Sequence, residues 1–151
     1  MSAISDYWAR FLSESKQNPD EVGFSGELCF EDRGVTGMTQ LALVLSGRKT
    51  ALFQPYESFV INHEPLPLPD EMYIVEDRND EPKCIIQLTD VNVIPFGEIP
   101  WELARRDGED ESLGEWRERQ KSLFLEEADI CGFDFSDSTK IVCEIFALVY
   151  R

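Results

Sequence analysis

The sequence predicts one α+β domain over residues 1–151, built as a small, mostly antiparallel β-barrel or curled sheet with helices at its rim. Three observations predict this class. A length of 151 residues suits a single domain. Short β-prone segments fill the middle and the end of the chain, with helical segments between them. The regular strand–helix alternation of a doubly wound sheet is missing, which disfavours that fold.

The first expected element is an amphipathic helix near the N-terminus. Its apolar side chains recur at the spacing of one helix face: Ile4, Tyr7, Trp8, Phe11 and Leu12. Ser2 or Ser5 can cap its start, and the turn-forming segment 18–20 ends it. An aromatic stripe of this kind is typical of core packing.

A shorter helix is expected over 38–45, after a loop rich in glycine. Thr36 is its predicted N-cap, and Gly47 is predicted to end it in a left-handed conformation. The chain then continues through two adjacent cations, Arg48 and Lys49. Positive charge is favourable at a helix C-terminus, so pairing with the helix dipole is one explanation for them and ligand binding is the other.

Strands are expected over 51–53, 72–76, 84–88, 91–94 and 141–150. The turn-forming segment 77–80 separates two of them and predicts a β-hairpin. Pro67 and Pro69 keep the stretch around them out of the sheet, because proline cannot donate a ladder hydrogen bond.

Two helices are expected between the last strands. Pro100 opens a short one over 101–106, where its missing N–H costs nothing. Ser112 and Glu115 match a capping box and begin a longer one. Gln120 interrupts the apolar face of that helix, so it lies either at the edge of the face or in a polar site. The acidic segment 107–111 is expected to be solvent-exposed.

Charge and hydropathy restrict the partners of this protein. Thirty acidic residues against fourteen basic ones give a net charge of −16, and an acidic surface repels a phosphate backbone. Avid non-specific binding to duplexes is therefore not expected, while binding of a short strand or a nucleoside in a locally basic cleft stays open. The longest apolar run, 145–150, is far below the roughly 20 residues of a membrane helix. We expect no membrane partner and a cytoplasmic location, because residues 1–6 also lack signal-peptide features.

The four cysteines, at 29, 84, 131 and 143, are widely spaced and form no C-x-x-C pair. The only histidine is His63. Zinc sites use closely spaced cysteine and histidine pairs, so neither a metal nor another cofactor is expected. The apolar neighbours of the cysteines predict buried small side chains. A Cys–His nucleophile pair that uses His63 stays open.

Five segments of the chain resemble, in the same order, segments of one known protein family. In chain order they are CFED at 29–32, LVLSGRKTA at 43–51, VIPFGEIP at 93–100, GEDESL at 108–113 with Trp116 and Arg117, and GFDF at 132–135 with VCE at 142–144 and Phe146. The ordered set resembles the longer subfamily of ASCH domains, a branch of the PUA-like superfamily. This resemblance implies a PUA-like small antiparallel β-barrel with helices at the rim.

The resemblance also implies binding of RNA or nucleotides in a cleft at the barrel mouth. Some smaller members hydrolyse N4-acetylcytidine, and ribonuclease activity has been attributed to others. The small amidohydrolases carry Lys-x-x-Thr in a loop and a glutamate on a later strand. Here Lys49 keeps the lysine, Leu52 stands at the threonine position, and Gln87 aligns with the glutamate. Gln120 replaces the histidine of the longer subfamily's W-R-x-x-H motif.

The first hypothesis is a module that binds RNA, a nucleotide or a modified nucleoside. Leucine has no hydroxyl nucleophile, and glutamine does not exchange a proton near neutral pH, so Lys49 is the one catalytic candidate left. The cations can bind phosphate or carboxylate, the glutamines can bind a base edge, and the tryptophan can stack on a base. The cleft is expected to be bordered by Arg48, Lys49, Thr50, Gln87, Trp116, Arg117 and Gln120.

Two alternatives come from other functional classes. The second hypothesis is a hydrolase acting on a modified nucleoside or on RNA, in which Lys49 stabilises charge and Tyr56, Glu57 or Thr50 moves protons. The third is an acidic protein-interaction domain, suggested by the net charge and the segment 107–111. For Trp116 the competing explanation is simple core packing.

Overall fold

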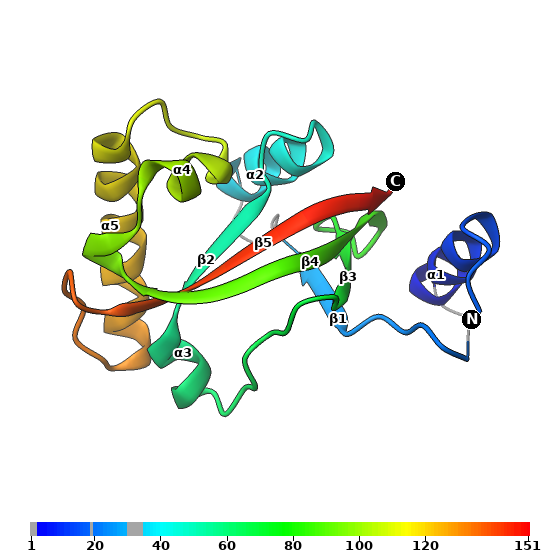
Figure 1. Cartoon of the computed structure of the whole chain (residues 1–151), viewed down its shortest axis with the longest axis horizontal. Helices are drawn as coiled ribbons and strands as arrows, with labels where there is room; N and C mark the ends of the chain where they lie inside the picture. Colours follow the sequence, from blue (N-terminus) through cyan, green and yellow to red (C-terminus); the bar gives the residue numbers. More distant parts are fainter. Residues whose placement is uncertain (1–2, 19, 30–34) are drawn as a thin grey trace.

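Five strands form one curled half-barrel sheet in the computed structural model, which describes residues 3–18, 20–29 and 35–151 (Figure 1). The order across the sheet is β1-β3-β4-β5-β2. The strands are β1 (Gly26–Cys29), β2 (Ala51–Pro55), β3 (Met72–Glu76), β4 (Pro82–Pro95) and β5 (Lys140–Tyr150). Only the β1–β3 pair is parallel. The predicted α+β class and the mostly antiparallel sheet are confirmed.

Strands β3 and β4 form the predicted hairpin. The Asp77 carboxylate accepts hydrogen bonds from the backbone N–H groups of Asn79 and Glu81 and so fixes the turn. Residues 84–88 and 91–94, predicted as two strands, belong to the single strand β4. This strand pairs with β5 from Ile85 to Pro95, and the register shifts after Leu88, where the predicted break lay.

In the described part of the chain, five α-helices pack around the sheet: α1 (Ala3–Glu14), α2 (Val35–Leu45), α3 (Tyr56–Ile61), α4 (Trp101–Ala104) and α5 (Leu113–Cys131). Helix α2 begins three residues before the predicted start, so Thr36 lies inside the helix and is not its N-cap. Helix α4 is followed by a 3₁₀ turn, η3 (Arg105–Asp107), and another, η2 (Phe96–Glu98), precedes it. Of the family-like segment 29–32, only Cys29 lies among the described residues.

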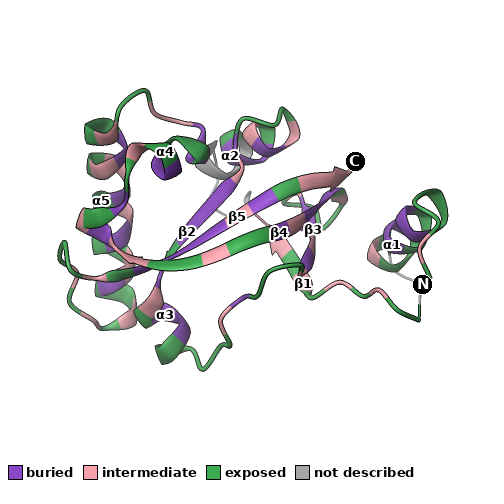
Figure 2. Cartoon of the chain, in the orientation of Figure 1, coloured by how far each residue is buried: buried purple, intermediate pink, exposed green. Residues whose placement is uncertain are grey.

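Three groups of apolar side chains hold the helices to the sheet. Helix α1 lies at the end of the molecule far from α5 (Figure 1) and buries Tyr7, Trp8, Phe11 and Leu12 against β3 and β4, as its stripe predicts. Helix α2 packs on β3, β4 and β5 through Leu41 and Val44. Trp116 and Phe124 of α5 pack on β2 and β5. Buried residues accordingly run along β2 and much of β5 in Figure 2.

Helix α5 begins at the predicted cap. The Ser112 hydroxyl accepts a hydrogen bond from the backbone N–H of Glu115 at 3.2 Å. The Glu115 carboxylate in turn accepts one from the backbone N–H of Glu111 at 3.0 Å. This double cap fixes where α5 starts, and it therefore fixes which side chains of α5 face the sheet.

Two of the cysteines are buried as predicted, and all four are free. Burial raises the pKa of Cys84 and of Cys143 to about 12. Neither thiol is therefore a ready nucleophile. Cys29 and Cys131 are partly exposed. Among the described residues no group of three or more histidine, cysteine or acidic side chains is arranged to hold a metal ion. None of the described helices is long and apolar enough to cross a membrane.

Candidate ligand-binding pocket

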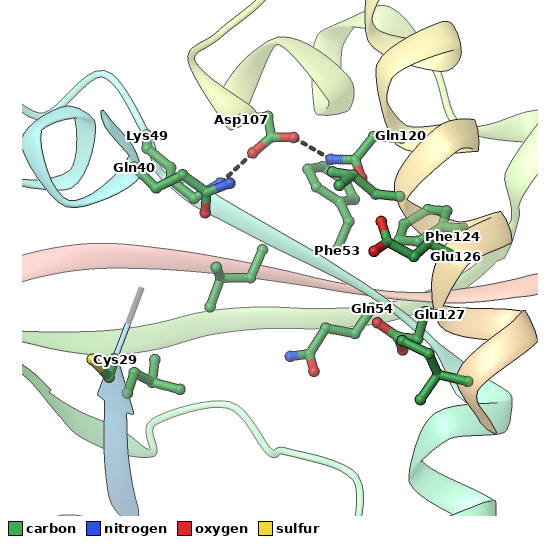
Figure 3. Close-up of a pocket in the computed structure, with 14 residues that line it drawn as sticks. Cys29, Gln40, Lys49, Phe53, Gln54, Asp107, Gln120, Phe124, Glu126 and Glu127 are labelled. Atoms are coloured by element: carbon green, nitrogen blue, oxygen red, sulfur yellow. Dashed lines mark hydrogen bonds and ion pairs between the residues drawn. The ribbon is translucent and has the colours of Figure 1, made fainter. Parts of the chain in front are cut away.

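A pocket of about 590 Å³ opens between α5, β2, α2, the end of β1 and the 3₁₀ turn η3 (Figure 3). This volume lies within the range of small-molecule sites. Its apolar lining comes from Leu28, Leu52, Phe53, Leu123, Phe124 and Ile130. Its polar lining comes from Cys29, Gln40, Lys49, Gln54, Asp107, Gln120, Glu126 and Glu127. Apolar walls with a few placed polar groups are typical of a ligand pocket.

An ion pair between Lys49 and Asp107 lies at one end of the pocket, and both side chains are almost wholly buried. The second carboxylate oxygen of Asp107 accepts three more hydrogen bonds: from Gln120 Nε2 at 2.5 Å, Arg119 Nη2 at 2.8 Å and Trp116 Nε1 at 3.0 Å. Burial alone would raise the pKa of Asp107, but the Lys49 ammonium and the Arg119 guanidinium hold it below its ordinary value. Asp107 is therefore ionised at neutral pH.

The backbone around α2 carries Lys49 to this position. Gly47 ends the helix at a φ of 83°, as predicted, and the N–H groups of Arg48 and Lys49 both donate to the Leu43 carbonyl at 3.0 Å. The Thr50 N–H then donates to the Arg106 carbonyl at 2.7 Å. This bond ties the loop to η3, which carries Asp107.

Gly108 allows the two backbone segments to approach each other. Its φ is 84°, and a Cβ atom added there would lie 2.9 Å from the Arg48 carbonyl oxygen. A side chain at this position would thus be strained by its backbone conformation and would also push the Lys49 loop away from Asp107.

We expect Gly108→Ala to cost more stability than Gly47→Ala. Both glycines have nearly the same positive φ, but a Cβ atom at Gly47 would meet nothing within 4 Å. The control Gly47→Ala should lower the free energy of unfolding by about 1 kcal/mol, from backbone strain alone. Gly108→Ala should lower it by about 2 kcal/mol, because it adds a steric clash to the strain. Urea denaturation measures both values. Equal losses would show that the close approach at Gly108 is not needed.

The acidic segment 107–111 is not uniformly solvent-exposed, and this corrects the sequence-based expectation. Asp107 is 2% exposed. Glu109 and Asp110 form ion pairs with Arg119 at 2.8 and 2.7 Å. Only Glu111 lies in the exposed class. The positive charges of buried Lys49 and half-buried Arg119 offset the free-energy cost of burying these carboxylates.

Two of the predicted site residues, Lys49 and Gln120, line the pocket together. Gln120 is the polar interruption of the apolar face of α5, and its amide donates to Asp107. Trp116 is completely buried, with its ring stacked on Phe96 at 5.7 Å between centroids and its edge against Phe53. The core-packing explanation therefore holds for Trp116, since no ring face is open to a base.

The other predicted residues lie outside the pocket lining. Arg117 donates hydrogen bonds to the carbonyls of Gly97 and Ile99, which tether α5 to η2. Arg48 is exposed. Thr50 Oγ1 accepts from Arg106 at 3.4 Å. Gln87 lies on β4 and donates to the Asp70 carbonyl at 3.2 Å. Gln87, which aligns with the glutamate of the small amidohydrolases, is thus not paired with Lys49. The carboxyl group that pairs with Lys49 belongs to Asp107.

The candidates for proton transfer are also absent from the pocket lining. Neither Tyr56 nor Glu57 lines the pocket. The Tyr56 ring lies 5.9 Å from the Lys140 ammonium, which contacts its face. Both residues belong to α3, a helix of six residues that the sequence patterns did not predict.

Sequence reasoning missed a second polar end of the pocket. Glu126 and Glu127 extend from α5 toward it in Figure 3. The Ser58 hydroxyl donates a hydrogen bond to Glu127. Gln54 Nε2 donates to Glu144 at 2.8 Å, and burial raises the pKa of Glu144 to about 7. The other residues of this polar group belong to β2, α3 and β5, which are far from the glutamates in the sequence. The expected helix over 123–127 was therefore the one signal in the sequence that could have indicated it.

Comparisons with known proteins agree with this architecture. Residues 29–150, most of the chain, match the family model of the ASCH domain. The structure of protein EF3133 from Enterococcus faecalis V583 superposes with a TM-score of 0.84 at 24% identity, covering 98% of this chain and 88% of that one. An ASCH domain from Lactobacillus crispatus JV V101 gives 0.81 at 21% identity, covering 99% and 95%. No curated protein sequence matches the chain. By its family-model match, this chain belongs to the ASCH domain family.

Proposed function

We propose that this protein binds a nucleoside, or an unpaired base of RNA, in the pocket described above. One observation carries the proposal: the buried Lys49 ammonium at the pocket's end. An ammonium group has three N–H donors, and among the described residues Asp107 is the only partner of this one. The remaining donors can bind a carbonyl or ring nitrogen, while the apolar walls contact a flat base. ASCH domains are generally thought to bind RNA, which supports the same class of ligand.

Binding is favoured over catalysis by the state of Asp107. Its two oxygens accept hydrogen bonds from four donors, which is about the number of lone-pair positions a carboxylate offers. Its lowered pKa further weakens it as a base. Asp107 therefore positions Lys49 and Gln120 and does not take a proton from water.

A hydrolase is the second candidate, and the burial of Lys49 favours it. An ammonium donor held in a pocket with apolar walls stabilises an oxyanion far better than one in water. Such an enzyme would use water to attack the carbonyl carbon of an N4-acetyl group; the C–N bond then breaks, the amine of cytidine leaves with a proton from the water, and acetate is released. The third candidate, an acidic interaction surface, loses support because Asp107, Glu109 and Asp110 are paired within the chain.

We expect Lys49→Met to weaken binding of N4-acetylcytidine by at least about tenfold. Methionine keeps much of the side-chain volume but supplies no donor, and Asp107 keeps three of its four partners. Calorimetric titration with N4-acetylcytidine, cytidine and short single-stranded RNA measures the loss. Lys121→Met, at an exposed position of α5 outside the pocket lining, is the matched control.

The same samples separate the two candidate functions. Release of acetate by the wild type and its loss in Lys49→Met would establish the hydrolase. Binding that depends on Lys49 without turnover would establish the binding module. Equal affinity of wild type and Lys49→Met for every ligand in the panel would overturn both, because each requires this ammonium group.

A further inference from the structure

We infer that the pocket selects a neutral or cationic ligand and keeps phosphate out, so that its ligand is an unphosphorylated, nucleoside-sized molecule with a donor-bearing group at Glu126 and Glu127. This inference rests on the proposed function and narrows it: of the two ligands proposed there, it selects the free nucleoside over a base of RNA, which carries phosphate. The residues that determine which ligand charge is accepted are the charged side chains of the pocket lining. Their number and sign are the observations from which the inference is argued.

At the Lys49 end the cations are outnumbered. Lys49 and Arg119 face three carboxylates, those of Asp107, Glu109 and Asp110, at ion-pair distances. The positive charge of Lys49 is therefore already balanced before any ligand arrives. Its N–H groups can still donate to a neutral acceptor, but no net positive charge is left to hold a phosphate.

Farther along α5, the exposed Glu126 and the half-buried Glu127 add two more carboxylates to a lining whose one cation, among the described residues, is Lys49. Glu126 and Glu127 both line the pocket, and the partner of Glu127 is the neutral Ser58 hydroxyl. Gln54 beside them is engaged by Glu144, a third carboxyl group. An ionised carboxylate only accepts hydrogen bonds. A ligand group at this end must therefore donate, as an amino, amide or hydroxyl group does.

The remaining cations near the pocket do not change this balance. Arg117 donates to the backbone carbonyls of Gly97 and Ile99 and does not line the pocket. Arg48, Arg105 and Arg106 are exposed, and none of them lines the pocket. The chain as a whole carries −16 charges, so the surrounding field also repels an anion. A terminal phosphate would meet like charge in the pocket and at its mouth.

A matched ligand pair tests the inference: N4-acetylcytidine and N4-acetylcytidine 5′-monophosphate, titrated against the wild-type chain at low and high salt. We expect the nucleoside to bind at least about tenfold more tightly than the monophosphate. This affinity gap between the two ligands should be smaller at high salt, where charges are screened. The double variant Glu126→Gln/Glu127→Gln should narrow the gap by improving the affinity for the monophosphate. The control Glu118→Gln/Asp129→Asn makes the same charge change at exposed α5 positions outside the lining and should leave the gap nearly unchanged.

Each result has one meaning. A monophosphate that binds as tightly as the nucleoside, or more tightly, overturns the charge selection and leaves the proposed function standing. A gap that is the same in both double variants overturns the assignment to Glu126 and Glu127. Absence of binding by both ligands overturns the proposed function together with the inference that rests on it.

Discussion

Asp107→Asn is expected to lower the free energy of unfolding by about 3–5 kcal/mol, because it leaves the buried Lys49 ammonium without its counter-charge. Asparagine has nearly the shape of aspartate, so the loss reports charge and hydrogen bonding and not a cavity. It also places a fifth donor group, the amide NH₂, where four donors now converge on the two oxygens of one carboxylate. Urea denaturation at neutral pH, followed by circular dichroism, measures the change.

Asp110→Asn is the matched control for this prediction. Asp110 shares Arg119 with Asp107 but has no contact with Lys49, and it is nearer the surface. Its loss should be about 1 kcal/mol, as for a partly exposed ion pair. If the two variants lose the same small amount of stability, the buried Lys49–Asp107 pair does not contribute as described.

The pH dependence of the Asp107 contribution has a definite sign. Its pKa is lower in the folded chain than in the unfolded chain, so the unfolded state binds the proton more readily. The stabilisation is therefore complete above the unfolded pKa, about 4, and is lost as the pH falls below it. The Asp107→Asn variant should lack this acid-dependent loss.

The sequence predicted those parts of the fold whose signals are local. The cap formed by Ser112 and Glu115, and the apolar face that follows it, placed the start of α5 correctly. The prediction divided β4 because the pairing register shifts between Leu88 and Asp90, where the pattern of a regular strand is interrupted. Helix α3 was missed because six residues after Pro55 are too few to show a helical period.

The candidate site was only partly predictable because its centre joins distant segments. The family resemblance identified Lys49, and a polar break in an apolar helix face identified Gln120. Asp107 stands 58 residues after Lys49 and begins an acidic run that had the appearance of a solvated loop. Trp116 and Arg117 keep family motif positions, yet their side chains serve packing and tethering.

Raising the pH from about 5 to about 8 is expected to destabilise this protein, and Glu144→Gln should remove much of that slope. Burial, with a smaller contribution from the nearby Glu71 carboxylate, raises the pKa of Glu144 from 4.5 to about 7, although the Gln54 amide opposes this. Between these two values the folded state holds a proton that the unfolded state has released. The contribution of Glu144 to stability is therefore lost as the pH rises through this window, by up to about 3 kcal/mol.

Glu76 on β3 is expected to titrate in the same window, because burial and the neighbouring Glu27 raise its pKa to about 7. We therefore expect Glu144→Gln to remove about half of the slope and the double variant with Glu76→Gln to remove most of it.

Glu64→Gln deletes a charge at an exposed position and controls for general repulsion in a chain with a net charge of −16. Urea midpoints measured across the pH range test these expectations. A wild-type stability that stays constant through the window, or a Glu64→Gln variant that flattens it equally, would contradict them. Because Gln54 joins Glu144 to the pocket, the same titration should also alter ligand affinity, so the pH at which binding is measured must be fixed.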